Sequence, residues 1–239
     1  MKKLVVITGA SSGIGAAIAK RLSQAGHPLL LLARRIENLK ALDLPNCLCE
    51  QVDITQRTQL ELALQKAVKQ FGPVDALINN AGVMLLGQIE DQDPSQWSQM
   101  FAVNVLAILN SMQAVLAPMK EKNTGTIINI SSIAGRKTFG DHAAYCGTKF
   151  AVHAISENVR EEVADSNVRL ITIAPGAVET ELLSHTTSQS IKEGYEDWKV
   201  SMEGVLDADD VARAVEFAYA QPQNVCIREI VLAATRQQP

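Results

Sequence analysis

The 239-residue sequence has few cysteines, no excess of positive charge and no long apolar run. Its four cysteines are irregularly spaced, which excludes a disulfide framework. Lysine and arginine number 22 against 26 acidic residues, and this balance argues against nucleic-acid binding, which needs a concentrated basic face. No run of about 18 apolar residues occurs, so we expect no membrane span. The run Leu4–Ile7 is too short for a signal peptide, and we expect a soluble, cytoplasmic protein.

What the sequence does contain is a regular alternation of short apolar runs and longer helical patterns. The predicted strands are Leu4–Thr8, Leu29–Ala33, Cys47–Val52, Ala76–Asn79, Thr126–Ile130, Val168–Ala174 and Ile230–Ala233. The main helical patterns are Gly15–Ala25, Arg57–Phe71, Trp97–Met119 and Ala143–Ala164. Strict alternation predicts an α/β fold with a parallel sheet and helices on both faces. Since no linker or internal repeat divides the chain, we expect one domain over residues 1–239.

Residues 177–206 interrupt this rhythm, because they are polar and unevenly patterned. A long irregular segment in a compact domain is usually a functional lid or a mobile loop. His185, Tyr195 and Trp198 either line a substrate site beneath such a lid or pack within it. Regular structure is predicted to resume at Asp207, a suitable helix N-cap.

A glycine-rich turn, Gly9-x-x-x-Gly13-x-Gly15, follows the first predicted strand and leads into a helix. Glycines allow positive φ and close backbone approach, and the helix N-terminus beyond them offers unpaired N–H groups to an anion. The spacing differs from the Gly-x-Gly-x-x-Gly dinucleotide fingerprint, and any tight strand-to-helix turn could use glycines for structure alone. Its position after the first strand favours a pyrophosphate-binding turn.

The second predicted strand ends in Ala33-Arg34-Arg35, with no carboxylate. An acidic residue there would bind the ribose hydroxyls of NAD, whereas a guanidinium suits the 2′-phosphate of NADP. The alternative is that both arginines are solvated at the start of the next helix. We expect NADP, with Arg34 as a better candidate than Arg35.

Tyr145 and Lys149 are four residues apart at the start of a helical pattern, so their Cβ atoms lie about 5–6 Å apart on one helix face. A phenol with a pKa near ~10 is a poor acid or base at neutral pH. We expect the ammonium to lower that pKa, so that the tyrosine exchanges a proton with an alcohol–carbonyl couple. A tyrosine–lysine pair at this spacing also arises by chance on helix surfaces.

Ser132 follows the fifth predicted strand, ahead of Tyr145. Ligands of open α/β sheets bind beyond the carboxyl ends of the strands, where we expect both side chains to lie. A serine hydroxyl can hydrogen-bond a substrate oxygen as charge develops on it. The neighbouring Ser131 is the competing candidate, although such serines often bond only local backbone.

Together these motifs resemble the short-chain dehydrogenase/reductase family over nearly the whole chain. In family order they are Thr8-Gly9-x-x-x-Gly13-x-Gly15, Asn79-Asn80-Ala81-Gly82, Asn104, Ser132, Tyr145-x-x-x-Lys149 and Pro175-Gly176 leading to Thr180. The resemblance implies a single-domain Rossmann-like, doubly wound parallel sheet and hydride transfer between NADP(H) and a carbonyl or alcohol. It also implies a homo-oligomer, a homotetramer or dimer, formed through the helices Trp97–Met119 and Ala143–Ala164.

The resemblance assigns roles to individual residues. Tyr145 would be the acid/base and Ser132 would orient and polarise the carbonyl. Lys149 would bind the nicotinamide ribose and lower the tyrosine pKa, and Asn104 would support a water relay to that lysine. The cofactor-binding residues that it implies are Gly9, Ser11, Ser12, Gly13, Ile14, Gly15, Arg34, Arg35, Asp53, Ile54, Asn80, Ala81, Gly82, Tyr145, Lys149, Pro175, Gly176, Val178 and Thr180.

Several of these residues also have a structural interpretation. Asp53, implied to touch adenine, could cap a helix, as Thr55 could. The pair Asn79-Asn80 could be a buried turn. Asn104 interrupts an apolar helix, where a polar side chain requires a structural hydrogen bond whether or not it serves a relay.

Other reactive side chains are not predicted to be sites. Cys146 lies about 100° around the helix from Tyr145 and is expected to be a packed thiol that points away from it. Cys47-x-Cys49 has no neighbouring histidine, so we predict no metal site. His142 could approach the substrate, but a surface histidine is the simpler interpretation.

We therefore predict an NADP-dependent oxidoreductase for a small carbonyl or secondary alcohol, with no nucleic-acid, membrane or metal partner. The Ala33-Arg34-Arg35 strand end and residues 228–237 resemble the branch that oxidises 3-hydroxy acids and serine-like compounds. A 3-oxoacyl reductase or a broad ketone reductase fits the same residues. A non-catalytic NADP-binding sensor or scaffold is the alternative from another class, and the intact catalytic positions argue against it.

Overall fold

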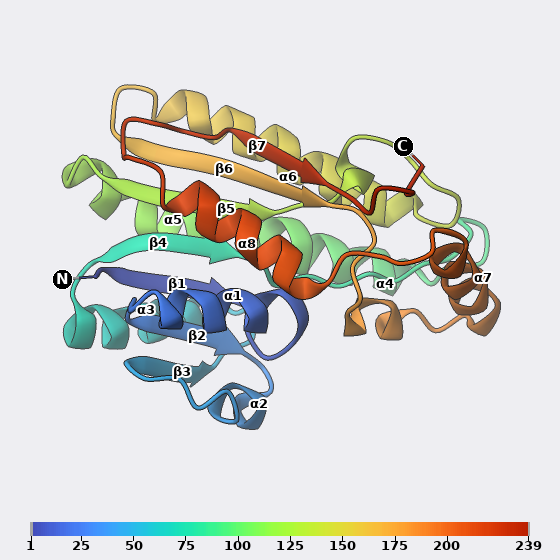
Figure 1. Cartoon of the computed structure of the whole chain (residues 1–239), viewed down its shortest axis with the longest axis horizontal. Coiled ribbons are helices and arrows are strands. Elements are labelled where there is room, and N and C mark those ends of the chain that lie inside the picture. Colours follow the sequence, from blue (N-terminus) through green and yellow to red (C-terminus); the bar gives the residue numbers. More distant parts are fainter. Residues whose placement is uncertain (1, 239) are drawn as a thin grey trace.

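The computed structural model describes residues 2–238 and contains one parallel sheet in the order β3-β2-β1-β4-β5-β6-β7 (Figure 1). Its strands are β1 (Leu4–Thr8), β2 (Leu29–Ala33), β3 (Cys47–Gln51), β4 (Val74–Asn79), β5 (Gly125–Ile130), β6 (Val168–Pro175) and β7 (Glu229–Leu232). Every residue of β1, β2, β5 and β6 is buried, which explains their nearly continuous apolar sequences. The predicted fold class is confirmed, and each predicted strand is present with ends shifted by no more than two residues.

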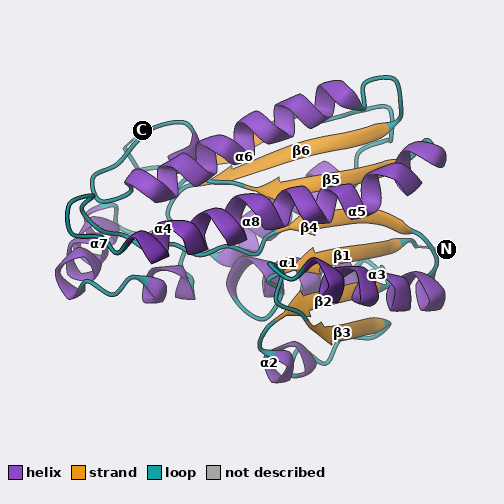
Figure 2. Cartoon of the chain, turned by 180° about the vertical axis from the view of Figure 1, so that it is seen from behind, coloured by secondary structure: helices purple, strands orange, loops and turns teal. Residues whose placement is uncertain are grey.

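Helices cover both faces of the sheet (Figures 1 and 2). One face packs against α1 (Gly13–Gln24) and α8 (Ala208–Tyr219), and the other against α3 (Arg57–Phe71), α5 (Ala107–Glu121) and α6 (Ala143–Glu162). The short helix α2 (Ile36–Lys40) follows β2. Side chains alternate between the two faces: in β1, Val6 joins the core beneath α3, α5 and α6, whereas Ile7 joins the core beneath α1 and α8.

The helix predicted over Trp97–Met119 has three parts. These are α4 (Pro94–Phe101), a π-helical turn (Ala102–Leu106) and α5. The continuous helix Pro94–Glu121 is long and apolar enough to cross a membrane by length and composition alone, and 44% of its most apolar window is buried within the protein. The core helix of a globular protein also passes this test, and here Ile108, Met112 and Val115 pack into the core.

Residues 177–206 are more regular than we predicted. They contain a 3₁₀ turn (Glu181–His185) and the helix α7 (Gln189–Ser201), and a bridge between Val178 and Leu206 joins their ends. Helix α7 lies beyond the carboxyl ends of the strands, at the right of Figure 1. Asp207 is the N-cap of α8, as predicted, and forms a capping box with Asp210.

Candidate active site

The turn between β1 and α1 presents the amino end of the helix to a cavity. Gly9 and Gly13 have φ angles of 64° and 51°, a region that favours glycine. Ser12 is the N-cap residue but makes no capping hydrogen bond through its side chain, so N–H groups of the first turn are available to an anion. Gly15 faces inward, where a Cβ atom would collide with the Gly9 carbonyl oxygen.

The segment after β4 holds this turn in place. The Asn80 Nδ2 atom donates to the carbonyl oxygens of Thr8 (3.0 Å) and Gly9 (3.1 Å). The backbone N–H groups of Asn80 and Ala81 both donate to Thr8 Oγ1 at 3.0 Å. Asn79 is 2% exposed and lies within the sheet, so its role is structural, whereas Asn80 both holds the turn and lines the cavity.

The two arginines that follow β2 differ in their contacts. Arg35 donates to the hydroxyls of Ser12 (2.7 Å) and Ser11 (3.3 Å), and it forms an ion pair with Glu181 at 2.9 Å. Arg34 lines the cavity and is exposed, and its side chain makes no hydrogen bond within residues 2–238. The structure thus brings Arg35, not the preferred Arg34, against the glycine-rich turn. Sequence reasoning missed Glu181, since no local pattern links it to Arg35.

Tyr145 and Lys149 lie on one face of α6, and both line the cavity. The Lys149 ammonium is 5.7 Å from the centroid of the Tyr145 ring and donates to the Ile130 carbonyl at 3.1 Å. Ser132 follows β5, and its hydroxyl donates to the Pro175 carbonyl at 3.3 Å. The three predicted side chains therefore meet at the carboxyl end of the sheet.

The pKa of Tyr145 differs from our expectation. Burial raises the pKa of Tyr145 above its ordinary value, the phenol of Tyr195 raises it further, and hydrogen bonding with Ser132 acts in the opposite direction. Burial also lowers the pKa of Lys149 to about 8. In this structure the pKa of Tyr145 is thus raised, because desolvation of the phenol is the largest influence on it, and the expected lowering by the Lys149 ammonium stays a prediction.

Asn104 is fully buried in the π-helical turn. Its Oδ1 atom accepts from the Val83 N–H (2.9 Å), and its Nδ2 atom donates to the Val83 carbonyl (2.9 Å) and to Thr148 Oγ1 (3.1 Å). The Thr148 hydroxyl in turn donates to the Tyr145 carbonyl at 2.7 Å. The expected structural hydrogen bond is confirmed, and it connects Asn104 to the first turns of α6. The water relay stays a prediction.

The segment after β6 closes over the site. Thr180 packs against the glycine-rich turn, since a Cβ atom on Gly13 would be 3.1 Å from the Thr180 methyl group. The backbone N–H of Ala177 donates to Gln237 Oε1 at 2.9 Å, and a Cβ atom on Gly176 would collide with that oxygen. Gln237 lines the cavity and was missed, because nothing in the sequence indicates that the end of the chain returns here.

Asp53 does not cap a helix, although its side chain has a structural contact, and its predicted contact with adenine stays a prediction. Its carboxylate accepts from the N–H (3.0 Å) and the hydroxyl (2.8 Å) of Thr55, which shapes the turn before α3. The N-cap residue itself is Gln56. Asp53 also lines the cavity, together with Ile54.

A single cavity of about 1090 Å³ brings the predicted site residues together. Gly15 and Asn104 are the two predicted site residues that do not line it. The predicted residues that line it are Gly9, Ser11, Ser12, Gly13, Ile14, Arg34, Arg35, Asp53, Ile54, Asn80, Ala81, Gly82, Ser132, Tyr145, Lys149, Pro175, Gly176, Val178 and Thr180. Segments far apart in the sequence thus form one site at the edge of the sheet where α/β proteins bind ligands.

The side chains not predicted to be sites have mixed outcomes. Cys146 is buried, as expected, and its thiol contacts the Lys137 carbonyl. The sulfur atoms of Cys47 and Cys49 are 3.7 Å apart, and the described part of the chain contains no cluster of residues that could hold a metal ion. His142 is half-buried and lines the cavity, and its approach to the substrate stays a prediction.

Known proteins share both the sequence and the fold. Residues 3–191 match the family described as short chain dehydrogenase. An uncharacterized oxidoreductase of Staphylococcus saprophyticus is 36% identical, over 98% of this chain and 97% of its own. Glycine betaine reductase of Emericella nidulans is 36% identical over 96% of this chain, which corresponds to only 18% of that longer protein.

Solved structures agree with these relatives. The closed form of a serine dehydrogenase complexed with NADP⁺ has a TM-score of 0.93 and 29% identity, covering 99% of this chain and 96% of that one. An alcohol dehydrogenase from the archaeon Thermococcus sibiricus, complexed with 5-hydroxy-NADP, has a TM-score of 0.87 and 26% identity, covering 100% of this chain and 99% of that one. The chain belongs to the short-chain dehydrogenase/reductase family of oxidoreductases.

Proposed function

We propose that the protein is an NADP(H)-dependent oxidoreductase that interconverts a carbonyl compound and a secondary alcohol, with Tyr145 as the acid/base. The observation that carries the proposal is the meeting of Ser132, Tyr145 and Lys149 in one cavity with a glycine-rich turn and an uncapped helix N-terminus. The NADP-bound serine dehydrogenase and the archaeal alcohol dehydrogenase support the cofactor and the reaction class.

The residues that line the cavity fit a dinucleotide phosphate. The N–H groups at the start of α1 suit the pyrophosphate, and Arg34 and Arg35 suit the 2′-phosphate. Gly82 and Lys149 both line the cavity and lie close together, since a Cβ atom on Gly82 would be 4.0 Å from the Lys149 ammonium, so both are positioned to contact the same ribose. When bound, the cofactor supplies or accepts the hydride.

The remaining cofactor assignments follow the cavity wall. We assign the adenine to Asp53 and Ile54, the riboses to the segment after β4 together with Lys149, and the nicotinamide to the segment after β6. The cofactor-binding set is Gly9, Ser11, Ser12, Gly13, Ile14, Gly15, Arg34, Arg35, Asp53, Ile54, Asn80, Ala81, Gly82, Tyr145, Lys149, Pro175, Gly176, Val178 and Thr180. Gly15 contributes indirectly, because it has no Cβ atom to collide with the Gly9 carbonyl oxygen and so permits the tight turn.

In a reduction, each side chain of the site has a distinct role. Ser132 hydrogen-bonds the substrate oxygen, where negative charge develops. The raised pKa of Tyr145 keeps its hydroxyl protonated at neutral pH, so it donates a proton to that oxygen as the carbonyl carbon gains a hydride. The products are the alcohol and the oxidised cofactor. In the reverse direction the Tyr145 phenolate accepts the proton of the alcohol, and the positive charge of Lys149 stabilises that phenolate.

The first test is reduction of a panel of carbonyl compounds with NADPH, followed by the loss of NADPH absorbance. Removing the phenolic hydroxyl in Tyr145→Phe eliminates the proton donor, and we expect turnover to fall by about 10²–10⁴-fold. Tyr219→Phe is the matched control, because Tyr219 hydrogen-bonds Asp75 at the far end of the sheet. Turnover that is unchanged in Tyr145→Phe contradicts the proposal.

We also propose that the protein forms a homo-oligomer through α4, α5 and α6. Four large apolar side chains on these helices and on the π-helical turn are exposed: Phe101 (40%), Leu106 (55%), Leu109 (39%) and Phe150 (43%). Light scattering at micromolar concentration is expected to give a multiple of the chain mass. A monomeric mass contradicts this part of the proposal.

The likeness to serine dehydrogenase supports a 3-hydroxy acid or serine-type substrate. The aromatic side chains that line the substrate side of the cavity instead favour an uncharged, apolar compound.

A further inference from the structure

One wall of the cavity, formed by α7 and the loop before α6, is aromatic. Tyr195 and Trp198 come from α7, and Phe139 and His142 come from the loop. The ring centroids of Tyr195 and Trp198 are 5.3 Å apart, and His142 lies 5.6 Å from Phe139 and 6.4 Å from Tyr195. Phe139 and Trp198 are 6.4 Å apart, so the four rings form one connected group. Since only 4% of the chain is Phe, Trp or Tyr, this concentration sets the wall apart from the rest of the molecule.

The aromatic wall adjoins the proposed reaction centre. The ring centroids of His142 and Tyr145 are 6.1 Å apart in an edge-on arrangement. The Tyr195 phenol is close enough to Tyr145 to raise its pKa. A group attached to the reacting carbon would therefore contact these rings, because the substrate oxygen has to reach the Tyr145 hydroxyl.

The charged side chains that line this side of the cavity do not favour an anionic substrate; the Lys137 ammonium, 5.0 Å from the Phe139 ring centroid, is not among the lining residues. The Lys199 ammonium already pairs with Glu179 and Glu196, both at 2.8 Å. Burial lowers the pKa of His142, so its ring is neutral at neutral pH. Asp141 also lines the cavity and would repel a carboxylate. Of the two arginines that line the cavity, Arg35 donates to Ser12 in the glycine-rich turn and Arg34 precedes it in the sequence, so both follow β2 on the side that we assign to the cofactor phosphates.

We propose that the substrate carries an uncharged aromatic or similarly flat apolar group next to its carbonyl or alcohol carbon, and that this group binds against Tyr195, Trp198, Phe139 and His142. Aromatic rings prefer edge-on and offset contacts with other rings, which this wall offers. The inference rests on the proposed function, because it places the reacting carbon at Tyr145. It assigns substrate selection to α7, a helix that no sequence motif of the site includes.

The test compares uncharged and anionic carbonyl compounds under the same conditions. We expect kcat/KM with NADPH to be at least about tenfold higher for acetophenone than for acetoacetate, with butanone between them. In the reverse direction, phenylethanol is expected to be oxidised and serine is not. A higher kcat/KM for acetoacetate, or efficient oxidation of serine, overturns the proposal.

Variants in α7 test whether its aromatic side chains determine the preference for an aromatic substrate. Trp198→Leu and Tyr195→Leu keep an apolar side chain but remove a ring, and we expect KM for acetophenone to rise roughly tenfold with kcat changed less. Tyr195→Phe keeps the ring and is expected to retain the preference for acetophenone over acetoacetate. Val200→Ala is the matched control, because Val200 lies on the same helix with 76% of its surface exposed. Unchanged selectivity in both leucine variants overturns the role of the aromatic wall.

A binding measurement separates this inference from the proposed function. Titration of phenylethanol and of 3-hydroxybutanoate into the protein, with and without NADP⁺, is expected to give measurable heat for phenylethanol and much weaker binding for the anion. If phenylethanol binds and Tyr145→Phe turns over normally, the mechanism fails while the substrate class stands. If the wild-type protein reduces carbonyl compounds in a Tyr145-dependent way but binds the anion better, the substrate class alone is wrong.

Discussion

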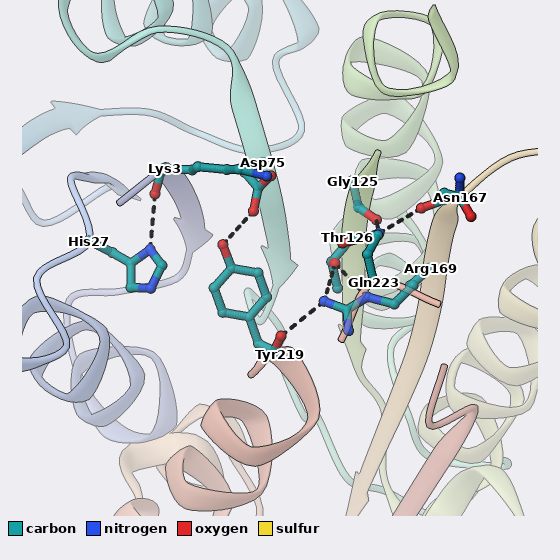
Figure 3. Close-up of polar contacts among 9 residues, drawn as sticks. All are labelled: Lys3, His27, Asp75, Gly125, Thr126, Asn167, Arg169, Tyr219 and Gln223. Carbon is teal, nitrogen blue, oxygen red and sulfur yellow. Dashed lines mark hydrogen bonds and ion pairs between the residues drawn. The ribbon is translucent and has the colours of Figure 1, made fainter. Parts of the chain in front are cut away.

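The two ends of the sheet use polar side chains in opposite ways. At the amino ends of the strands, Arg169 is only 3% exposed, and it donates to Thr126 Oγ1 and to the Tyr219 carbonyl (Figure 3). The Tyr219 hydroxyl donates to Asp75 at 2.6 Å, and Lys3 pairs with the same carboxylate at 2.8 Å. These groups satisfy one another and tie strands β1, β4, β5 and β6 to the end of α8.

At the carboxyl ends, the polar groups face a cavity. The N-terminus of α1 has no side-chain cap, Lys149 is buried with its pKa lowered to about 8, and the Tyr145 phenol is kept neutral by burial. Such groups are costly to bury without full sets of partners, and they keep hydrogen-bonding capacity for a ligand. The same sheet thus places structural polar networks at one end and chemically available groups at the other.

Breaking the amino-end network is expected to have the largest effect on stability. Arg169→Met removes the donor from a buried hydroxyl and several carbonyls, and we expect the free energy of unfolding to fall by about 3 kcal/mol, as measured by urea titration. The folded fraction is expected to keep its kcat. Arg57→Met is the control, because the Arg57 pair with Glu61 is exposed and contributes under about 1 kcal/mol. Equal losses in both variants would contradict the contrast between the two ends.

At the carboxyl end, replacing an arginine is expected to change cofactor selection instead of stability. Arg34→Ala and Arg35→Ala should each weaken NADPH binding roughly tenfold or more and NADH binding much less, because NADH has no 2′-phosphate. Calorimetric titration with both cofactors provides the measurement. Arg21→Ala is the control, since Arg21 pairs with Asp209 and Glu216 on α8. Equal losses for NADPH and NADH would refute the phosphate role.

The pH profile of the reduction tests whether Lys149, at the carboxyl end of the sheet, is available for chemistry. Burial lowers the pKa of Lys149, so its ammonium loses a proton as the pH rises through about 8. We expect kcat/KM for NADPH to be level below that pH and to decline above it, because the uncharged amine binds the cofactor ribose less well. In Lys149→Met the profile should be low and without this decline. A wild-type profile that stays level to pH ~10, the ordinary range of lysine, would contradict the assignment.

The smallest expected effect concerns Glu181. Its carboxylate pairs with Arg35, and that guanidinium lowers the pKa of Glu181. A 2′-phosphate has to share Arg35 with this carboxylate, so Glu181→Gln is expected to strengthen NADPH binding a few-fold. Repeating the titration at high salt should reduce the difference, because the pair is exposed and screened. Weaker binding in Glu181→Gln would show that the carboxylate supports the cofactor.

The fold and most of the site could be predicted because both follow local patterns. The strands are buried on both faces, so each appears as an almost uninterrupted apolar run. Positions such as Gly9 and Gly13 require a residue type that the sequence displays directly. Tyr145 and Lys149 share one helix face because of helical geometry alone.

The structural features that were not predicted depend on weak sequence patterns or on contacts between residues far apart in the sequence. Helix α7 has no fully buried residue. Ile191 and Tyr195 pack against the core at helical spacing within a polar stretch, and Trp198 contacts Tyr195 on the same side. That spacing was the one signal that could have revealed it. The pairing of Arg35 with Glu181 depends on chain segments that only the tertiary fold brings together. The raised pKa of Tyr145 results from burial, which the sequence does not report.

The π-helical turn at Ala102–Leu106 has a consequence for how this long helix tolerates change. A π turn holds one additional residue in a widened turn, so the sequence patterns of the stretches before and after it are offset by one residue while both stretches keep their faces toward their neighbours. That offset lets Asn104 point inward while α4 and α5 each keep their own contact faces. Deleting one residue within this turn is therefore expected to give an ordinary α-helical turn and to leave α4 and α5 facing the same neighbours. A one-residue deletion within α4 or α5 would instead rotate part of the helix by roughly 100° and turn it away from its neighbours.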